Sequence, residues 1–552
     1  MKIFKLFPLA CAALMMSACS SDNDIEGGAT NPGGDAQYLA VNIVNVGTTP
    51  TGRGVLGYEN GTTEESEIKT IRFYFFHADG SAYTLEGTTP GSVKNYLEKD
   101  INNPGDMGTT DGSGTEEAVT KAILVINGTN KKAPASVIAV VNPESISPAL
   151  DTGTKNLNEL SKTLTGSQFY NVTSKDKFVM TNSVYVEAGR TVCPVTVAGH
   201  IGTNKEDAET KAVDIYAERV VAKVDADLQG GSLVANTAGT SKYGMKVGTY
   251  GASTDIYAVI DGWGVADEND NAYVEKQIDN NWLADNLGIN PWTTNNFHRS
   301  FWETSPAFAA GTPTNHTFAD YTAQHNDVLY TLPNTQPTAV AAANKYNNDL
   351  TKFLVTATLR YQDDATGAWQ NAEICKYQGV EYLGIDALKE AIATTYKQYY
   401  KKVGGVYTPI QASDVEFTTA GTSLKDYEVS PVLKTTETYY KEDASSADGY
   451  TALTAAENIN KFPAEVRTDG KVYYFIPIRH IAADAAKVGY YGVVRNHWYK
   501  IALKSLTGYG TPVYDENKII DPTMPEDQAT YLAAKINVLQ WRVVSQDVNL
   551  GK

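Results

Sequence analysis

The sequence predicts a mainly β protein, organised as β-sandwiches with a few short helices. Its 552 residues include 34 tyrosines, and Tyr, Thr and Val are residue types that favour strands. Segments in which apolar and polar residues alternate recur along the chain, separated by Gly, Asn and Asp clusters that favour turns. The strands follow one another without the regular helices of βαβ units, so sandwiches are the favoured architecture.

The first 18 residues have the organisation of an export signal. A positively charged N-terminal segment with Lys2 and Lys5 precedes the apolar run Leu6–Met16, and this run is too short to span a bilayer stably. A small-residue pair then precedes Cys19, an arrangement that resembles a bacterial lipobox and makes Cys19 the expected lipid acceptor. An ordinary secretory signal is the alternative. Residues 20–35 are expected to form a flexible acidic tether.

Residues 37–46, QYLAVNIVNV, are the first predicted strand. The strand is loosely attached, because the glycine-containing segments NPGG and GTTPTGRG flank it. Arg53 follows with a glycine on either side, and no other Lys or Arg occurs between Lys5 and Lys69. Proteases prefer flexible, exposed backbone of this kind.

The body of the chain is interpreted as two domains with a boundary near residue 228. Strand patterns in the first domain occur at 68–80, 122–128, 136–142, 178–183, 191–198 and 218–228, with a short helical candidate at 156–164. Strand patterns in the second occur at 254–260, 352–361, 471–480 and 497–506. Apolar residues at helical spacing also predict an amphipathic helix at 385–400, laid on a sheet.

The last segment, residues 531–550, contains two alternating apolar runs that join at Leu539. A loop-prone run at 515–530 precedes it and is expected to act as a tether. Such a strand must fill a groove in its own domain or in a neighbouring molecule, and the strand at 37–46 could compete for the same groove, as in donor-strand assembly. The expected donor side chains are Ile536, Val538, Leu539, Trp541, Val543, Val548 and Leu550.

Composition excludes some partners. The net charge of −18 argues against nucleic acid and anionic membrane surfaces, which require basic patches. Of the 4 cysteines, Cys11 lies in the export signal and Cys19 at the lipid site. The remaining two, Cys193 and Cys375, do not make a disulfide framework, and the sequence leaves open whether they pair.

No catalytic constellation is visible. The motifs H-E-x-x-H, C-x-x-C, G-x-S-x-G and Walker A do not occur, so we predict no enzyme, no cofactor and no metal site. His298, His480 and His497 are interpreted as structural histidines. The run DENDN at 267–271 has oxygen ligands at alternate positions but lacks the glycine and distal glutamate of a calcium loop, so a solvated turn is favoured.

A set of short motifs spans the chain from the lipobox to the C-terminal end. They are FVMTNS at 178–183, AERVVAKV at 217–224, RSFWETSP at 299–306, LPNT at 332–335, YYFIPIRH at 473–480, GVVRNHWYKI at 492–501 and NVLQWRVVSQDVNL at 537–550. In these motifs the chain resembles the Bacteroidota fimbrillin family, the structural subunits of type V pili. The resemblance is greatest to the shaft subunit of the short (minor) fimbriae, and the C-terminal motif is the most specific.

The resemblance implies two transthyretin-like β-sandwich domains, at 54–228 and 229–514, followed by a tether and C-terminal donor strands at 515–552. It implies a lipoprotein signal at 1–18 and a lipidated tether with a removable strand at 19–53. An Arg-specific protease would cut between Arg53 and Gly54, and the C-terminal strand of another subunit would fill the exposed groove.

The partners implied by the resemblance are other copies of the chain in a head-to-tail polymer, accessory tip and anchor subunits, and the outer membrane through the lipid. The implied role is adhesion and biofilm formation at the cell surface. The intact C-terminal strand favours a shaft role, because a tip subunit has no subunit beyond it to receive the strand.

Two other functions are weighed against this one. A surface glycan-binding lipoprotein of β-sandwich domains would share the lipobox, the tether and the aromatic loops, but would have no use for a tethered C-terminal strand. A hydrolase would need catalytic carboxylates or a nucleophile, and only carboxylates brought together from distant loops would escape detection in the sequence.

Overall fold

The computed structural model describes about seven tenths of the chain. The described residues are 37–46, 61–85, 94–100, 107–111, 116–126, 132–146, 154–160, 163–165, 169–170, 174, 176–183, 185–187, 190–192, 194–228, 234–235, 243–278, 302–323, 328–340, 344, 347–421, 424–480, 488–522, 531–539 and 544–546. Within these ranges no helix is both long and apolar enough to cross a membrane.

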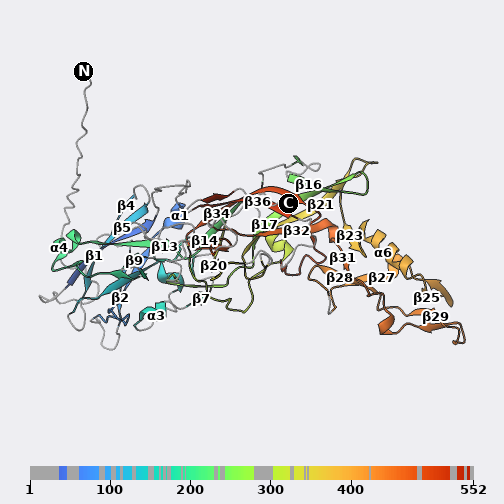
Figure 1. Cartoon of the computed structure of the whole chain (residues 1–552), viewed down its shortest axis with the longest axis horizontal. Helices are drawn as coiled ribbons and strands as arrows, with labels where there is room; N and C mark the ends of the chain where they lie inside the picture. Colours follow the sequence, from blue (N-terminus) through green and yellow to red (C-terminus); the bar gives the residue numbers. More distant parts are fainter. Residues whose placement is uncertain are drawn as a thin grey trace, which may run out of the picture.

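The N-terminal region is a ten-stranded sheet (Figure 1). Its strands in hydrogen-bonded order are β3 (Tyr96–Asp100), β2 (Thr70–Phe76), β6 (Ser136–Val141), β8 (Met180–Asn182), β13 (Val213–Arg219), β1 (Gln37–Val46), β5 (Glu116–Ile126) and β4 (Met107–Asp111), with β11 (Val195–Thr196) beside β6 and β12 (Ile201–Gly202) beside β1. The core of this region includes Phe73, Phe75 and Val140, none of which has any exposed surface.

Short elements complete this region. They are α1 (Thr63–Ser66), η1 (Pro143–Ile146), α3 (Leu157–Leu160), α4 (Lys205–Thr210) and the hairpin of β9 (Tyr185–Glu187) with β10 (Arg190–Val192). In addition, β7 (Thr163–Thr165) pairs with β18 (Asn271–Tyr273), which comes from the second half of the chain. The two halves therefore share a strand pair.

The second half begins with a sandwich of two sheets. One has the order β19 (Leu329–Thr331), β14 (Ala222–Asp227), β34 (Trp498–Thr507), β36 (Tyr531–Leu539) and β37 (Val544–Gln546). The other has the order β15 (Val234–Ala235), β16 (Tyr243–Tyr250), β17 (Thr254–Ala266), β21 (Lys352–Gln362), β32 (Lys471–Pro477) and β35 (Thr511–Pro512), with β22 (Trp369–Asn371) beside β21. Side chains of β14 and β34 share one core with those of β17, β21 and β32, as expected for a β-sandwich.

The chain between β21 and β32 builds a third lobe, which extends to one end of the molecule (Figure 1). It contains a five-stranded sheet of β24 (Val380–Leu383), β23 (Ile374–Tyr377), β31 (Ala464–Glu465), β28 (Glu428–Leu433) and β27 (Val415–Thr418), and a four-stranded sheet of β26 (Val406–Pro409), β25 (Tyr399–Val403), β29 (Tyr439–Glu442) and β30 (Tyr450–Ala452). The helix α6 (Ile385–Thr395) packs Leu388 and Ile392 into the lobe's own core.

The described part of the second half also contains small elements. In the sandwich region these are α5 (Phe318–Ala323) and the pair of β20 (Asn334–Thr335) with β33 (Gly492–Val493), and in the third lobe they are η5 (Ala412–Asp414) and η6 (Ala455–Glu457). A further turn, η7 (Thr468–Gly470), leads into β32.

The predicted fold class is confirmed: the protein is mainly β with a few short helices. The predicted helix at 385–400 forms as α6 but ends at Thr395, because Tyr399 and Tyr400 pair with β29 as part of β25. The helical candidate at 156–164 is shorter still, since only 157–160 are helical and β7 follows. The predicted bounds of the two domains, at 54–228 and 229–514, remain predictions. A separate core in the third lobe was not predicted from the sequence.

Two expectations differ from the structure. The run at 267–271 is not a solvated turn: Asp267 is fully buried and forms an ion pair with the equally buried Lys352. The expected tether at 515–530 is fixed to the body as far as residue 522, because Ile520 is buried and its N–H donates to the carbonyl of His316 at 2.9 Å. Residues 523–530 lie outside the described ranges.

Cys375 is a buried free thiol, and its burial raises its pKa to about 12. Cys193 and His298 lie outside the described residues. His480 and His497 are buried, and their Nδ1 atoms lie within hydrogen-bonding distance of the Tyr499 hydroxyl and the Arg495 carbonyl, at 2.8 Å and 2.7 Å respectively.

Candidate assembly site

The first feature of this site is the position of β1 inside the N-terminal sheet. Its neighbour on one side is β5, antiparallel from Gln37↔Ile126 to Val46↔Glu116. On the other side β13 runs parallel to it from Val41↔Val213 to Asn45↔Ala217, and β12 pairs antiparallel at Tyr38 and Leu39. Strand β1 therefore forms backbone hydrogen bonds with neighbouring strands on both of its edges.

Side chains of β1 also complete the core. Leu39 has no exposed surface and Val41 is 1% exposed, and both belong to the same cluster as Phe73 and Ile215. Burying two such side chains stabilises by about 3–6 kcal/mol, at 1.5–3 kcal/mol each. Removal of β1 would separate β13 from β5 and leave an open groove lined by apolar residues.

The second feature is the C-terminal hairpin of β36 and β37. Along its length β36 pairs antiparallel with β34, from Trp498↔Leu539 to Thr507↔Tyr531. Its other neighbour is β37, which pairs at Ile536↔Gln546 and Val538↔Val544 and has no further strand beyond it in the described part of the chain. A single ladder, to β34, thus connects this hairpin to the rest of its sheet.

The predicted site residues fall partly within this arrangement. Ile536, Val538 and Leu539 lie on β36, opposite Ile501, Tyr499 and Trp498. The predicted lipid acceptor, the cleavage site and the remaining donor side chains lie outside the described residues; these are Cys19, Arg53, Gly54, Trp541, Val543, Val548 and Leu550.

The strand β34 that carries β36 is anchored at the junction of the two halves. Lys223 lies on β14, which pairs in parallel with β34. Its Nζ atom is 2.7 Å from a carboxylate oxygen of Glu65 and 3.8 Å from the ring centroid of Trp498 on β34. Burial alone would raise the pKa of the Glu65 carboxyl, but hydrogen bonds from Lys223 and Tyr330 lower it overall. Glu65 belongs to the N-terminal region, so this charge cluster joins both halves.

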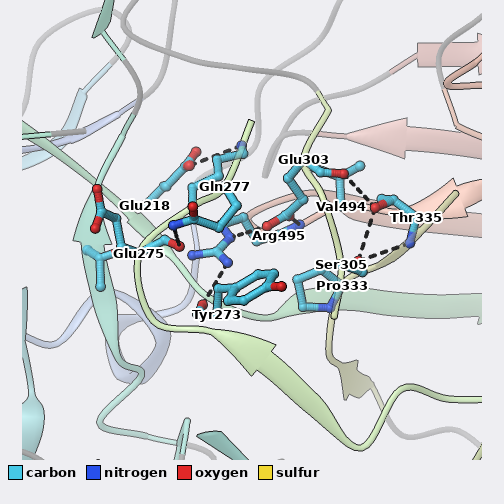
Figure 2. A network of polar contacts seen from close by, with 12 residues as sticks. Glu218, Tyr273, Glu275, Gln277, Glu303, Ser305, Pro333, Thr335, Val494 and Arg495 are labelled. Carbon is cyan, nitrogen blue, oxygen red and sulfur yellow. Dashed lines mark hydrogen bonds and ion pairs between the residues drawn. The ribbon is translucent and has the colours of Figure 1, made fainter. Parts of the chain in front are cut away.

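A second buried network fixes the start of β34 (Figure 2). Arg495 donates from Nε to Glu303 at 2.7 Å, and from its terminal nitrogens to the carbonyls of Val274 and Tyr273 at 3.1 Å and 2.8 Å. Both ionic side chains are 1% exposed. Because Tyr273 lies on β18, which pairs with β7, the network connects β34 to the N-terminal region.

None of these charged residues was predicted from the sequence to have a structural role. A signal was present, because Glu303 and Arg495 lie in the motifs RSFWETSP and GVVRNHWYKI and Lys223 lies in AERVVAKV. What the motifs could not indicate is that residues so far apart in sequence meet at one junction.

Comparison with known families identifies the C-terminal part of the chain. Residues 467–547, which include β32, β34 and β36, match the family described as "Major fimbrial subunit protein type IV, Fimbrillin, C-terminal". The match confirms the predicted resemblance to the fimbrillin family over this C-terminal region. The sequence has no match among the curated proteins.

Several solved structures are similar to the chain at low identity. Fimbrilin FimA from Porphyromonas gingivalis shares 13% identity, with 92% of this chain and 99% of that chain covered and a TM-score of 0.32. The tip fimbrial protein Mfa3 from the same organism, with a C-terminal truncation, shares 11% identity, with 91% and 99% covered and a TM-score of 0.29. A candidate cell adhesion protein from Parabacteroides distasonis shares 13% identity, with 91% and 98% covered and a TM-score of 0.35. TM-scores this low do not by themselves establish a common fold.

Proposed function

We propose that the protein is the shaft subunit of a surface fimbria, structural rather than catalytic, that polymerises by donor-strand exchange. The precursor is exported as an outer-membrane lipoprotein through Cys19, and an Arg-specific protease cuts after Arg53 and releases β1. The C-terminal strand of a second copy then enters the vacated groove. Repetition of this step builds a head-to-tail polymer that supports adhesion and biofilm formation, with accessory tip and anchor subunits at its ends.

The observation that carries this proposal is a sequence shared by the two strands. Residues 38–43 of β1 read YLAVNI, and residues 531–536 of β36 read YLAAKI. Tyr, Leu and Ala are identical at the first three positions and Ile at the sixth. The strands have similar lengths, 10 and 9 residues, so β36 can span nearly the whole groove that β1 fills.

The alignment assigns a register to the exchange. Leu532 takes the place of the buried Leu39, and Ala534 takes that of Val41. The apolar face is retained, because side chains two apart lie on the same face of a strand. A slip by one residue would turn Leu532 away from the core, so the buried face specifies the register strongly.

The ladders on the two strands favour exchange in energetic terms. When β36 leaves its own sheet, it loses the backbone hydrogen bonds to β34. In the groove left by β1 it can form hydrogen bonds with β5 on one edge and with β13 on the other. Each ladder hydrogen bond contributes roughly 0.5–1.5 kcal/mol net. The added ladder offsets part of the cost of ordering the donor segment, about 1–2 kcal/mol per residue.

A disulfide cross-link tests the register. In the single chain Ala40 lies opposite Ile123, so Ala533 of one copy is expected to lie opposite Ile123 of the next. Chains carrying Ala533→Cys are mixed with chains carrying Ile123→Cys, cleaved, assembled and oxidised. We expect a disulfide-linked dimer on a non-reducing gel, because directly opposed residues of an antiparallel pair lie about 4.5–5.5 Å apart, within disulfide range.

The matched control places the donor cysteine one residue later, at Ala534, where it faces the opposite side of the sheet. Equal cross-linking of Ala534→Cys and Ala533→Cys would contradict the register. Polymers that form without either cross-link would contradict the register but leave strand exchange standing, whereas an absence of polymers would contradict the proposed function itself.

Cleavage is tested separately at Arg53. With Arg53→Ala, we expect a folded, lipidated precursor that stays monomeric, because β1 keeps its place between β5 and β13. Gel electrophoresis without boiling shows whether polymers form, and N-terminal sequencing of the wild-type polymer is expected to begin at Gly54. Polymerisation of Arg53→Ala at the wild-type rate would show that this cleavage is not the trigger.

A further inference from the structure

The four-stranded sheet of the third lobe has two different faces. One face carries Tyr399 and Tyr439, which are buried in the lobe's core. The opposite face carries side chains from the alternate positions of all four strands, as the register shows. The residues of this tyrosine face are Tyr400, Lys402, Tyr407, Pro409, Tyr440, Glu442, Tyr450 and Ala452.

The tyrosine face is curved. Tyr407 lies on one edge strand, β26, and Tyr450 on the other, β30, with β25 and β29 between them. Their rings nevertheless stack, with centroids 3.9 Å apart and planes at 16°. The sheet must therefore twist or curl so that side chains of its two edge strands meet above this face.

The rings hold one another in place. Tyr400 meets Tyr450 edge to face at 5.0 Å, and Tyr440 meets Tyr407 in the same way at 5.1 Å. All four tyrosines are half-buried, so each ring keeps part of its surface open to solvent. The turn between β25 and β26, Gly404-Gly405, has φ values of 57° and 88°, which suit the tight hairpin that brings Tyr407 over the sheet.

Polar groups surround the rings. The Tyr407 hydroxyl donates to Asp448 at 2.5 Å and the Tyr400 hydroxyl to Glu442 at 2.7 Å, while Lys402 lies 3.3 Å from Asp448. The hydrogen bond from Tyr407 lowers the pKa of Asp448 to about 2, so this carboxylate stays ionised. The exposed carboxylates have further lone pairs for accepting hydrogen bonds, and Lys402 supplies a donor.

We propose that the tyrosine face binds a short, uncharged oligosaccharide. The C–H groups on the flat side of a sugar ring fit the electron-rich faces of tyrosine rings that are partly open to solvent. Sugar hydroxyls both donate and accept hydrogen bonds, and the face offers carboxylate acceptors beside an ammonium donor. Lys402, Glu442 and Asp448 together carry one positive and two negative charges, a net charge of −1, so the face disfavours acidic partners and carries too little charge to select a strongly basic one.

The size of the face favours an oligosaccharide over a protein. Four strands about 4.8 Å apart and roughly four residues long cover at most on the order of 200 Å² when flat, and curling reduces this area. A stable protein interface needs about 800 Å² on each partner. A face this small suits a few sugar rings.

The tyrosine face is independent of strand exchange. In Figure 1, β25 and β29 lie at the end of the molecule opposite β1 and β2. An unassembled chain and a chain within a polymer would therefore both bind the oligosaccharide through this face. The proposal can be tested without forming a polymer.

The experiment applies the fluorescently labelled full-length chain to a printed array of neutral and sialylated oligosaccharides, and titrates the neutral oligosaccharide with the highest signal. We expect Tyr407→Ala and Tyr450→Ala each to weaken binding by about two- to tenfold, because each removes one aromatic contact and frees the neighbouring rings. Tyr257→Ala, which removes a half-buried tyrosine from a different sheet, is the matched control and is expected to bind like the wild type.

Circular dichroism verifies that each variant is folded. If the alanine variants unfold the lobe, Tyr407→Phe keeps the stacked ring and removes only its hydroxyl, and is expected to weaken binding by a smaller factor. The proposal is overturned if no neutral oligosaccharide binds, if only sialylated ones bind, or if binding is equal in Tyr407→Ala, Tyr407→Phe and Tyr257→Ala. Self-association of the wild type that Tyr407→Ala abolishes, without sugar binding, would instead assign the face to a second copy of the chain.

Discussion

Deletion of residues 531–552 is expected to leave a folded chain that cannot donate a strand. The deletion removes β36 and β37, whose connection to the rest of their sheet is the single ladder to β34. After the deletion β34 keeps its parallel neighbour β14, and its side chains Tyr499, Ile501 and Leu503 remain in the sandwich core. The cleaved, truncated chain should therefore stay monomeric on gels run without boiling.

The truncated chain retains the groove between β5 and β13, so it should still accept a strand from an intact copy. Mixed with intact, cleaved chains, it is expected to cap growing ends and shorten polymers in proportion to its share of the mixture. A thermal unfolding scan supplies the control. If truncation lowers the unfolding midpoint of the second half by tens of degrees, β36 is an integral strand of its own domain and the donor-strand proposal fails.

The parts of the fold that could be predicted from the sequence are those with a long, regular pattern. The strand at 37–46 and the helix that begins at Ile385 are clear in the sequence because each is ten or more residues long and carries apolar residues at regular spacing. The third lobe could not be predicted as a unit, since its strands have two to six residues and turns separate them. Such short runs carry too little periodicity to distinguish a strand from a loop.

In the candidate site, too, the strands could be predicted from local patterns, whereas the buried ion pairs could not. Alternating patterns identified both strands that we propose exchange places, because alternation over several residues is typical of a strand. The run at 267–271 was misread as solvated because its acidic and amide residues carry no trace of the distant Lys352 that pairs with Asp267. Buried ion pairs depend on contacts between residues far apart in the chain, and no local pattern encodes them.

The other large effect is expected at Glu303, in the network at the start of β34. Glu303→Ala leaves the guanidinium of Arg495 buried without its carboxylate partner, and loss of one member of a buried ion pair costs about 3–5 kcal/mol. Arg495 also links β34 to the carbonyls of Tyr273 and Val274, so a weakened network should loosen the strand that holds β36. We expect a large fall in the denaturant midpoint of unfolding and faster release of the C-terminal hairpin, measured by hydrogen exchange of β36 amides.

The matched control is Asp255→Ala, which removes an ion pair of the same 2.7 Å length to Lys246 whose side chains are 41% and 48% exposed. Solvent screens such a pair, so its loss should leave the denaturant midpoint nearly unchanged. Glu303→Gln keeps the shape and the hydrogen-bonding oxygen but removes the charge, and should lie between the two. If Glu303→Ala is no more destabilising than Asp255→Ala, water must reach Arg495 in the folded protein, and the junction would not be the buried anchor that we infer for β34.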